Sequence, residues 1–196
     1  AARLALAGLL LLYLARPDLP QFEGKAMWFR AAIYPALAAV VPLLWIRRGR
    51  PGPYPHLPDG LLVLPLTADA AGNAADLFRF VEFGWALHFT SMALITSGLG
   101  MFVATRDLGR GVSAALVLGT GSVLHTLWEL LEWAGVAWLG IDLDIRYATT
   151  MGDFAAGLGG STLGALVTAR FSWPRPHLGG ALFANRSACP RVSERR

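Results

Sequence analysis

Three residues of the stretch HTLWELLEW carry side chains that could bind a metal ion or transfer a proton. His125, Glu129 and Glu132 are separated by four and then three positions, so they share one face of a helix. The sequence on both sides of this stretch is almost entirely apolar. Ionisable side chains inside an apolar helix are costly to bury, and they commonly mark a functional site.

Further polar residues on other predicted helices would extend this group. If successive helices cross a membrane in opposite directions, these residues fall in the outer parts of neighbouring helices. The whole predicted polar cluster is Asp69, Asn73, Asp76, His88, His125, Glu129, Glu132 and Asp153. Imidazole and carboxylate groups from facing helices suit a divalent metal such as Zn²⁺, Mn²⁺ or iron. The same groups could instead share a proton or only hydrogen-bond the helices together, and the sequence leaves these alternatives open.

The two histidines of this cluster have one more interpretation. His88 lies close to Trp85, and His125 lies close to Trp128. A neutral imidazole can also ligate the metal of a chlorin or a haem. A pigment or haem ligand is therefore a further alternative for His88 and His125, and their spacing does not distinguish it from helix packing.

The elements that must position these residues are predicted to be membrane helices. Of the 196 residues, 55% are hydrophobic and 15% are charged, and the mean hydropathy is +0.48. Soluble domains carry about 25% charged residues, and a membrane span needs about 20 apolar residues. The sequence therefore predicts an all-α fold, a polytopic membrane bundle of about six transmembrane helices. The predicted spans are residues 3–15, 28–46, 57–78, 83–105, 112–138 and 150–171.

The segment 57–78 is the least certain span, because it is apolar only as far as Leu66 and then carries two aspartates. An interfacial or re-entrant segment is the alternative. If it crosses, the basic stretch 47–50, Arg106 with Arg110, and the C-terminal arginines all lie on one side, as the excess of basic residues in cytoplasmic loops requires. We therefore predict both termini in the cytoplasm, in a bacterial inner membrane of the cytoplasmic or intracytoplasmic kind. The first span is short, as if trimmed or processed at the N-terminus.

Two domains are predicted, a bundle over residues 1–172 and a basic cytoplasmic tail over residues 173–196. Prolines and glycines in the tail oppose a regular helix. Its arginines are Arg175, Arg186, Arg191, Arg195 and Arg196. Arginine binds carboxylates and phosphates bidentately, so we expect the tail to contact a partner. The expected partners are membrane lipids and other integral-membrane subunits, and not nucleic acid, because the basic residues cluster as in a membrane protein.

The last predicted helix carries Gly157, Gly160 and Gly164 within GLGGSTLG. Small residues at such spacing let the backbones of two helices approach closely. We therefore expect this helix to pack tightly against a neighbour.

Four stretches in order, TADAAGNAADLF, LHFTS, LWELLEW and TTMGDFAAGLGGSTLG, resemble the uncharacterised YjdF-type bacterial inner-membrane proteins and, more distantly, the VanZ-like proteins. The similarity covers roughly residues 57–170. It implies that His88, Glu129, Glu132 and Asp153 match residues that gather between helices in that family. Where the family has acids, this chain has Gly84 with Trp85, and Thr149. The resemblance therefore implies the scaffold, with part of its polar site missing.

Three functional hypotheses follow from the sequence. The first is a non-catalytic accessory or structural subunit of a larger membrane complex, respiratory or photosynthetic, since the sequence lacks the G-x-S-x-G, phosphate-loop, CxxC and H-E-x-x-H motifs. The second is a metal-dependent membrane hydrolase. It would use His125, Glu129, Glu132, Asp153 and Asp69. The third is a membrane subunit that handles a pigment or protons.

Overall fold

All regular structure in the described part of the chain is helical. A computed structural model describes residues 1–50, 52–104, 108–141, 143 and 146–170. The α-helices are α1 (Ala2–Ala15), α2 (Met27–Ala38), α3 (Val40–Arg47), α4 (His56–Ala74), α5 (Val81–Val103), α6 (Arg110–Leu139) and α7 (Tyr147–Arg170), with the short 3-10 turns η1 (Pro20–Phe22) and η2 (Leu77–Arg79). The prediction of an all-α fold is confirmed, and each of the predicted segments is helical over most of its length.

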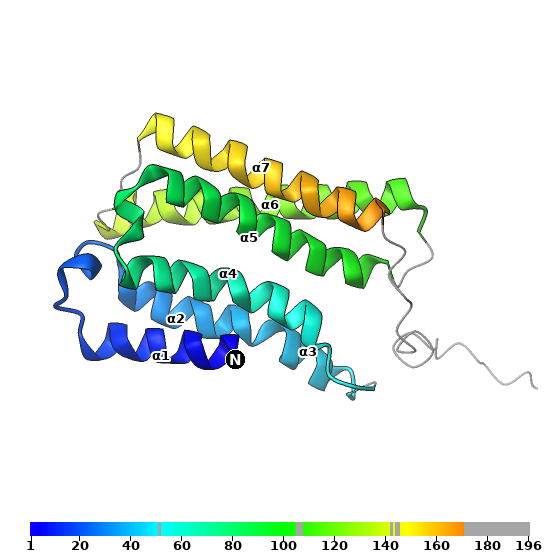
Figure 1. Ribbon diagram of the computed structural model, residues 1–196, viewed down its shortest axis with the longest axis horizontal. Helices are drawn as coiled ribbons and strands as arrows, with labels where there is room; N and C mark the ends of the chain where they lie inside the picture. Colours follow the sequence, from blue (N-terminus) through cyan, green and yellow to red (C-terminus); the bar gives the residue numbers. More distant parts are fainter. Residues whose placement is uncertain (51, 105–107, 142, 144–145, 171–196) are drawn as a thin grey trace, which may run out of the picture.

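The helices lie side by side, and successive ones run in opposite directions (Figure 1). Helices α2 and α3 follow one another along the same line, separated only by Ala39, and act as one broken helix. The loop between α3 and α4, the start of α6 and the end of α7 therefore lie at one end of the bundle. The turns η1 and η2 and the end of α6 lie at the other end.

Within the described part of the chain, three helical segments are long and apolar enough to cross a membrane. They are Met27–Arg47 with 21 residues, Val81–Val103 with 23 residues and Arg110–Leu139 with 30 residues. Large apolar side chains are also exposed on the outside of the bundle, among them Leu11, Val112 and Leu166 at 60% or more. So much exposed apolar surface would be unfavourable in water, whereas the acyl chains of a bilayer would cover it. These features identify a helical membrane protein.

The first helices pack through large side chains. Leu6, Leu10 and Tyr13 of α1 are buried together with Val63 and Leu66 of α4 in one apolar core. The Tyr13 hydroxyl donates a hydrogen bond to the carbonyl of Ala70 in α4. These large side chains fill the space between α1 and α4 and thereby set the distance between the two helices.

At the break between α2 and α3, a side chain from α1 supplies a missing hydrogen bond. Pro42 has no N–H, so it leaves the carbonyl of Ala38 without its usual helical donor. Arg3 Nη2 donates to that carbonyl at 2.7 Å. The same guanidinium is paired with Asp59 of α4, with Nε 3.0 Å from Oδ2. Arg3 thus joins α1, α2 and α4 at this point.

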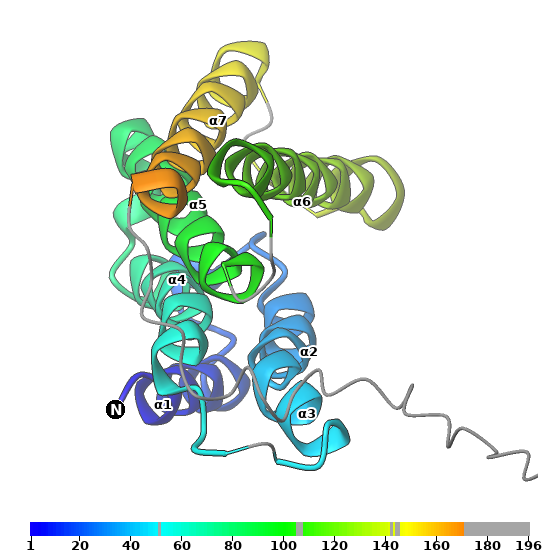
Figure 2. The same ribbon diagram turned by 90° about the vertical axis from the view of Figure 1, so that its right-hand side faces the viewer.

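Helices α5, α6 and α7 lie together in Figure 2, and they pack through small residues. A β-carbon added to Gly160 would overlap the backbone carbonyl of Phe89 in α5, and one added to Gly164 would overlap Thr96. On α6, a β-carbon at Gly121 would overlap Thr96 as well. The expected close approach at the glycines of α7 is therefore confirmed: Gly160 and Gly164 meet α5, and Gly157 meets His125 of α6.

We predict that Gly160→Ala lowers the thermal unfolding midpoint of the detergent-solubilised protein by several degrees. The new methyl group would meet backbone atoms of α5, which cannot rotate away, and overpacking of this kind costs about 1–3 kcal/mol. The matched control is Gly119→Ala in α6, where nothing lies within 4 Å of the new atom. Both changes gain helix propensity, so equal midpoints for the two variants would contradict the packing described here.

Candidate functional site

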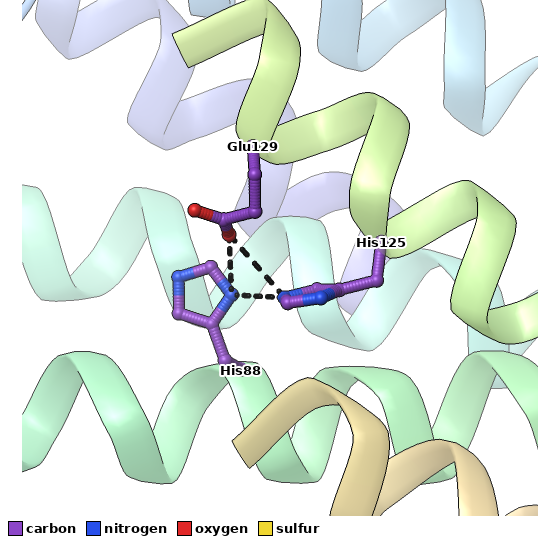
Figure 3. Close-up of side chains that lie close together, drawn as sticks. All are labelled: His88, His125 and Glu129. Atoms are coloured by element: carbon purple, nitrogen blue, oxygen red, sulfur yellow. Dashed lines mark hydrogen bonds and ion pairs between the residues drawn. The ribbon is translucent and has the colours of Figure 1, made fainter. Parts of the chain in front are cut away.

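The structure brings His88, His125 and Glu129 together at the contact between α5 and α6 (Figure 3). His125 and Glu129 lie one turn apart on α6, so their side chains point the same way. His88 reaches them from α5. The Nδ1 atom of His88 lies 3.0 Å from Nε2 of His125 and 3.5 Å from Oε1 of Glu129. His125 Nε2 lies 3.3 Å from the same oxygen.

Helix α7 fixes the position of the His125 ring. Gly157 lies directly against this imidazole, and a β-carbon there would overlap the ring atoms. Phe154, one turn earlier on α7, meets the ring edge-on with 5.7 Å between centroids. Only 4% of His125 and 8% of Glu129 is exposed. The close packing of α7 therefore holds the two α6 side chains in place.

One oxygen of the buried Glu129 carboxylate lacks a hydrogen-bond donor within the described part of the chain. Among the residues that the structure describes, none forms a hydrogen bond with Glu129 Oε1, although two imidazole nitrogens lie at ion-pair distance from it. A buried acceptor without a donor costs about 1–3 kcal/mol, and a charged one costs more. A cation between the three atoms would interact favourably with all of them.

The spacing of the three atoms fits a metal ion. Three ligand atoms of a tetrahedral ion with bonds of 2.0–2.1 Å lie about 3.3 Å from one another. The separations found here are 3.0, 3.3 and 3.5 Å. Two histidines and one carboxylate also form the ligand set of catalytic zinc sites and of non-haem iron sites. The trio can hold such an ion with only small side-chain movements.

Asp153 of α7 lies behind this trio and not in it. Its Oδ1 atom is 3.6 Å from Nε2 of His88, the ring nitrogen that faces away from Glu129. Histidines that ligate metals usually donate their second N–H to a carboxylate, which fixes the tautomer and the ring orientation. Asp153 is placed to do this for His88.

A large polar cavity opens in front of the trio. Its volume is about 940 Å³, and it is lined by residues of the loops at the η1 and η2 end of the bundle and of α5, α6 and α7. His88, Glu129, Glu132 and Asp153 all lie on its wall. An ion held by the trio could therefore be reached from the cavity on the side of His88 and Glu129.

Asp69 and Glu132 belong to a second cluster, which is built around Arg30 of α2. Only 6% of Arg30 is exposed. Its Nε lies 3.3 Å from Oδ2 of Asp69 in α4, and its Nη2 lies 3.9 Å from Oε1 of Glu132 in α6. The Tyr34 hydroxyl donates to the same Asp69 oxygen. Because these partners already occupy Asp69 and Glu132, neither carboxylate is free to join the histidines.

The remaining predicted residues are placed separately. Asn73 donates to the carbonyl and the carboxylate of Asp69, one turn earlier on α4. Asp76 follows the end of α4 and pairs with Lys25 at 3.4 Å and with Arg79 at 4.0 Å. The predicted partner-contact arginines, from Arg175 to Arg196, lie outside the described residues.

Sequence reasoning missed Arg30 and Tyr34. Both lie within the predicted span 28–46, and the arginine was the available signal, because a cation inside an apolar span requires a partner. It missed the pairing of Arg3 with Asp59 in the same way. Arg3 and Arg30 both lie inside predicted apolar spans, so the sequence itself indicates that each cation needs an acidic partner.

The chain matches no protein-family model, no curated protein and no solved structure in the three comparisons made. The resemblance to YjdF-type and VanZ-like proteins therefore stays a prediction. The function has to be inferred from the geometry of the site.

We predict that Arg30→Met destabilises the protein by about 3–5 kcal/mol, because it leaves two carboxylates unpaired in the interior of the bundle. The measurement is the unfolding midpoint in a denaturing-detergent titration. The control is Arg47→Met, at the exposed end of α3, which should leave the midpoint unchanged. The double variant Arg30→Met/Asp69→Asn should lose less than Arg30→Met alone, since it removes one of the unpaired charges. Equal midpoints for the two single variants would show that the cluster is not needed for stability.

Proposed function

We propose that this protein is a membrane-embedded, metal-dependent hydrolase whose ion is held by His88, His125 and Glu129. One observation carries the proposal. The three ligand atoms lie 3.0–3.5 Å apart, two of the three residues line a polar cavity, and one ligand atom is a buried carboxylate oxygen that has no hydrogen-bond donor among the described residues.

The chemistry follows from the number of ligands. Three protein ligands leave coordination positions for a water molecule and a substrate, as in catalytic zinc sites. A bound divalent ion lowers the pKa of its water and polarises the bond to be cut. Hydrolysis would then need only water and a base, and Asp153 supplies a carboxylate on the wall of the same cavity.

A small ion suits the site better than a pigment or a haem. The facing nitrogens of His88 and His125 are only 3.0 Å apart, which leaves no room for a flat macrocycle between them. A proton relay through the two imidazoles is the second chemistry that this short distance supports. Metal analysis separates the relay from the metal site, because a relay needs no ion.

The accessory-subunit hypothesis stays a prediction. Its expected contact surface was the arginine-rich tail, which lies outside the described residues. The exposed apolar side chains of the bundle would suit lipid as well as a partner subunit. No contact among the described residues favours one of the two.

We predict that the purified wild-type protein holds about one zinc, manganese or iron ion per chain, measured by inductively coupled plasma mass spectrometry. His125→Ala and Glu129→Gln should abolish this content, because each removes a ligand. Asp153→Asn should weaken affinity by about 10–100-fold, the usual effect of losing a carboxylate behind a ligating histidine. The control is His56→Ala, at the start of α4 and away from the cavity, which should keep its metal.

The hydrolase part of the proposal is tested with the same preparations. Metal-loaded wild-type protein should hydrolyse p-nitrophenyl phosphate or p-nitrophenyl acetate, and chelator-treated protein should not. The proposal fails if Glu129→Gln and His56→Ala hold equal amounts of metal, or if the chelator leaves hydrolysis unchanged.

We also propose that all six helical units cross the membrane, with α2 and α3 counted as one. The support is that the helices lie along one axis and alternate in direction, and that the basic stretch 47–50 and the start of α6 lie at one end of the bundle. That end would be cytoplasmic because it carries the excess of basic residues. The end with η1 and η2, where the cavity opens, would face outward.

We predict that cysteines placed at Arg50 and Phe80, one at a time in a Cys189→Ser background, react from opposite sides of the membrane. The two positions flank α4, so they lie on opposite sides only if α4 crosses. The measurement is labelling by a membrane-impermeant maleimide in intact cells and in inverted vesicles. Labelling of both from the same side would contradict the crossing of α4.

A further inference from the structure

An apolar groove runs between α2 and α6 beside the polar cavity. Its volume is about 260 Å³, and its walls include Phe29, Trp128, Leu131, Ala134, Trp138 and Ile141. Two features set it apart from an ordinary packing defect. It lies at the surface of the bundle, where Leu131 is 47% and Trp138 is 75% exposed. It also follows one helix pair over several turns of α6, from Trp128 to Leu139.

The groove and the polar cavity share a wall. Arg30, Glu132 and Leu143 line both spaces. A ligand with a polar head and an apolar chain could therefore lie with its head in the cavity and its chain in the groove. The two spaces together have the amphipathic character of a membrane lipid.

The groove lies between two helices that hardly pack against each other. Helices α2 and α6 are not among the pairs that pack extensively against each other, and Figure 2 shows α6 standing apart from α2 and α3. The ion pair of Arg30 with Glu132 spans the separation at 3.9 Å. A chain lying in the bilayer can reach the groove from the side.

The charge of the cavity favours a phosphate group on the ligand. Its walls carry the cations Lys25, Arg30, Arg79 and Arg146, and the acids Glu23, Glu129, Glu132 and Asp153. These charges balance, so a divalent ion on the trio makes the cavity net positive. Arg79 is exposed over 64% of its side chain, with its Nη1 atom 4.0 Å from Asp76 and its guanidinium over the Phe80 ring. Arginine and a bound divalent ion both bind phosphate oxygens well.

We infer that the substrate of the proposed hydrolase is a membrane lipid with a phosphate in its headgroup, which places one acyl chain in the groove between α2 and α6. This inference rests on the proposed function, since the ion contributes the excess positive charge. The rest of the lipid stays in the bilayer. The headgroup reaches the trio from the polar cavity.

The test is lipid binding followed by native mass spectrometry of the full chain in detergent. The probes are dioleoyl phosphatidic acid, dioleoylglycerol, which lacks the phosphate, and glycerol 3-phosphate, which lacks the chains. Phosphatidic acid should bind at least about tenfold more tightly than either of the others, a difference of 1.4 kcal/mol or more. Equal affinity for phosphatidic acid and dioleoylglycerol, or for phosphatidic acid and glycerol 3-phosphate, would overturn the inference.

A matched pair of variants tests the groove itself. Ala134→Trp fills the groove, and Ala137→Trp places the same side chain on the exposed surface of α6 outside it. Ala134→Trp should weaken binding of phosphatidic acid at least about fivefold, and Ala137→Trp should not change it. If Ala134→Trp binds as tightly as wild type, the chain does not lie in the groove.

A second measurement needs no substitution and covers the case in which Ala134→Trp fails to fold. Phosphatidic acid with a diazirine in the middle of one acyl chain should crosslink to Leu131 and Trp138 in preference to the lipid-exposed Leu11 and Leu43. Even labelling of these four positions overturns the inference. Metal content measured in parallel separates the two proposals. Selective lipid binding without bound metal overturns the hydrolase, whereas bound metal without selective lipid binding overturns the lipid inference alone.

Discussion

The burial of Arg30 is the constraint on which the arrangement of this bundle depends. Its guanidinium lies between Asp69 of α4 and Glu132 of α6, with contacts of 3.3 Å and 3.9 Å. In an apolar surrounding, a guanidinium without such partners would be strongly unfavourable, so the three helices must keep these positions. The ion cluster thereby fixes α6 relative to α2 although the two helices hardly pack. It also occupies the carboxylate of Glu132, so Glu129 alone on α6 faces the histidines.

The two ways of packing helices in this protein suit two tasks. Large side chains fill the space between α1, α2 and α4, and they give a bulky apolar core. Glycines bring α7 against α5 and against the His125 ring. A site that needs ligand atoms within about 0.5 Å of their positions is best built where backbones meet directly, because little can then move. The candidate metal site lies where α5, α6 and α7 meet, in this closely packed half of the bundle.

The sequence was sufficient for the helices and for part of the site. The apolar segments, the glycines of α7 and the one-turn spacing of His125 and Glu129 are local features, and the structure has each of them. The division of the polar residues into two clusters was not predictable in the same way. Whether Glu132 meets His88 or Arg30 depends on the rotation of α6 and on its distance from α2, and no spacing along the chain determines either. The cation that decides the division, Arg30, lies inside the apolar segment 28–46.

The proposed hydrolase would have to bring water and a lipid to the same bond, and the two spaces around Arg30 could meet this requirement separately. The polar cavity opens among loop residues such as Glu23, Arg79 and Arg146, at the end of the bundle, so water and ions can enter there. The groove between α2 and α6 is almost wholly apolar, which would suit an acyl chain. Arg30 and Glu132 stand at the boundary of both spaces. The Arg30–Glu132 ion pair would therefore lie at the junction between the acyl chain and the headgroup of a bound lipid. Glu132 is on α6, one turn after Glu129, so this junction would be close to the candidate metal site.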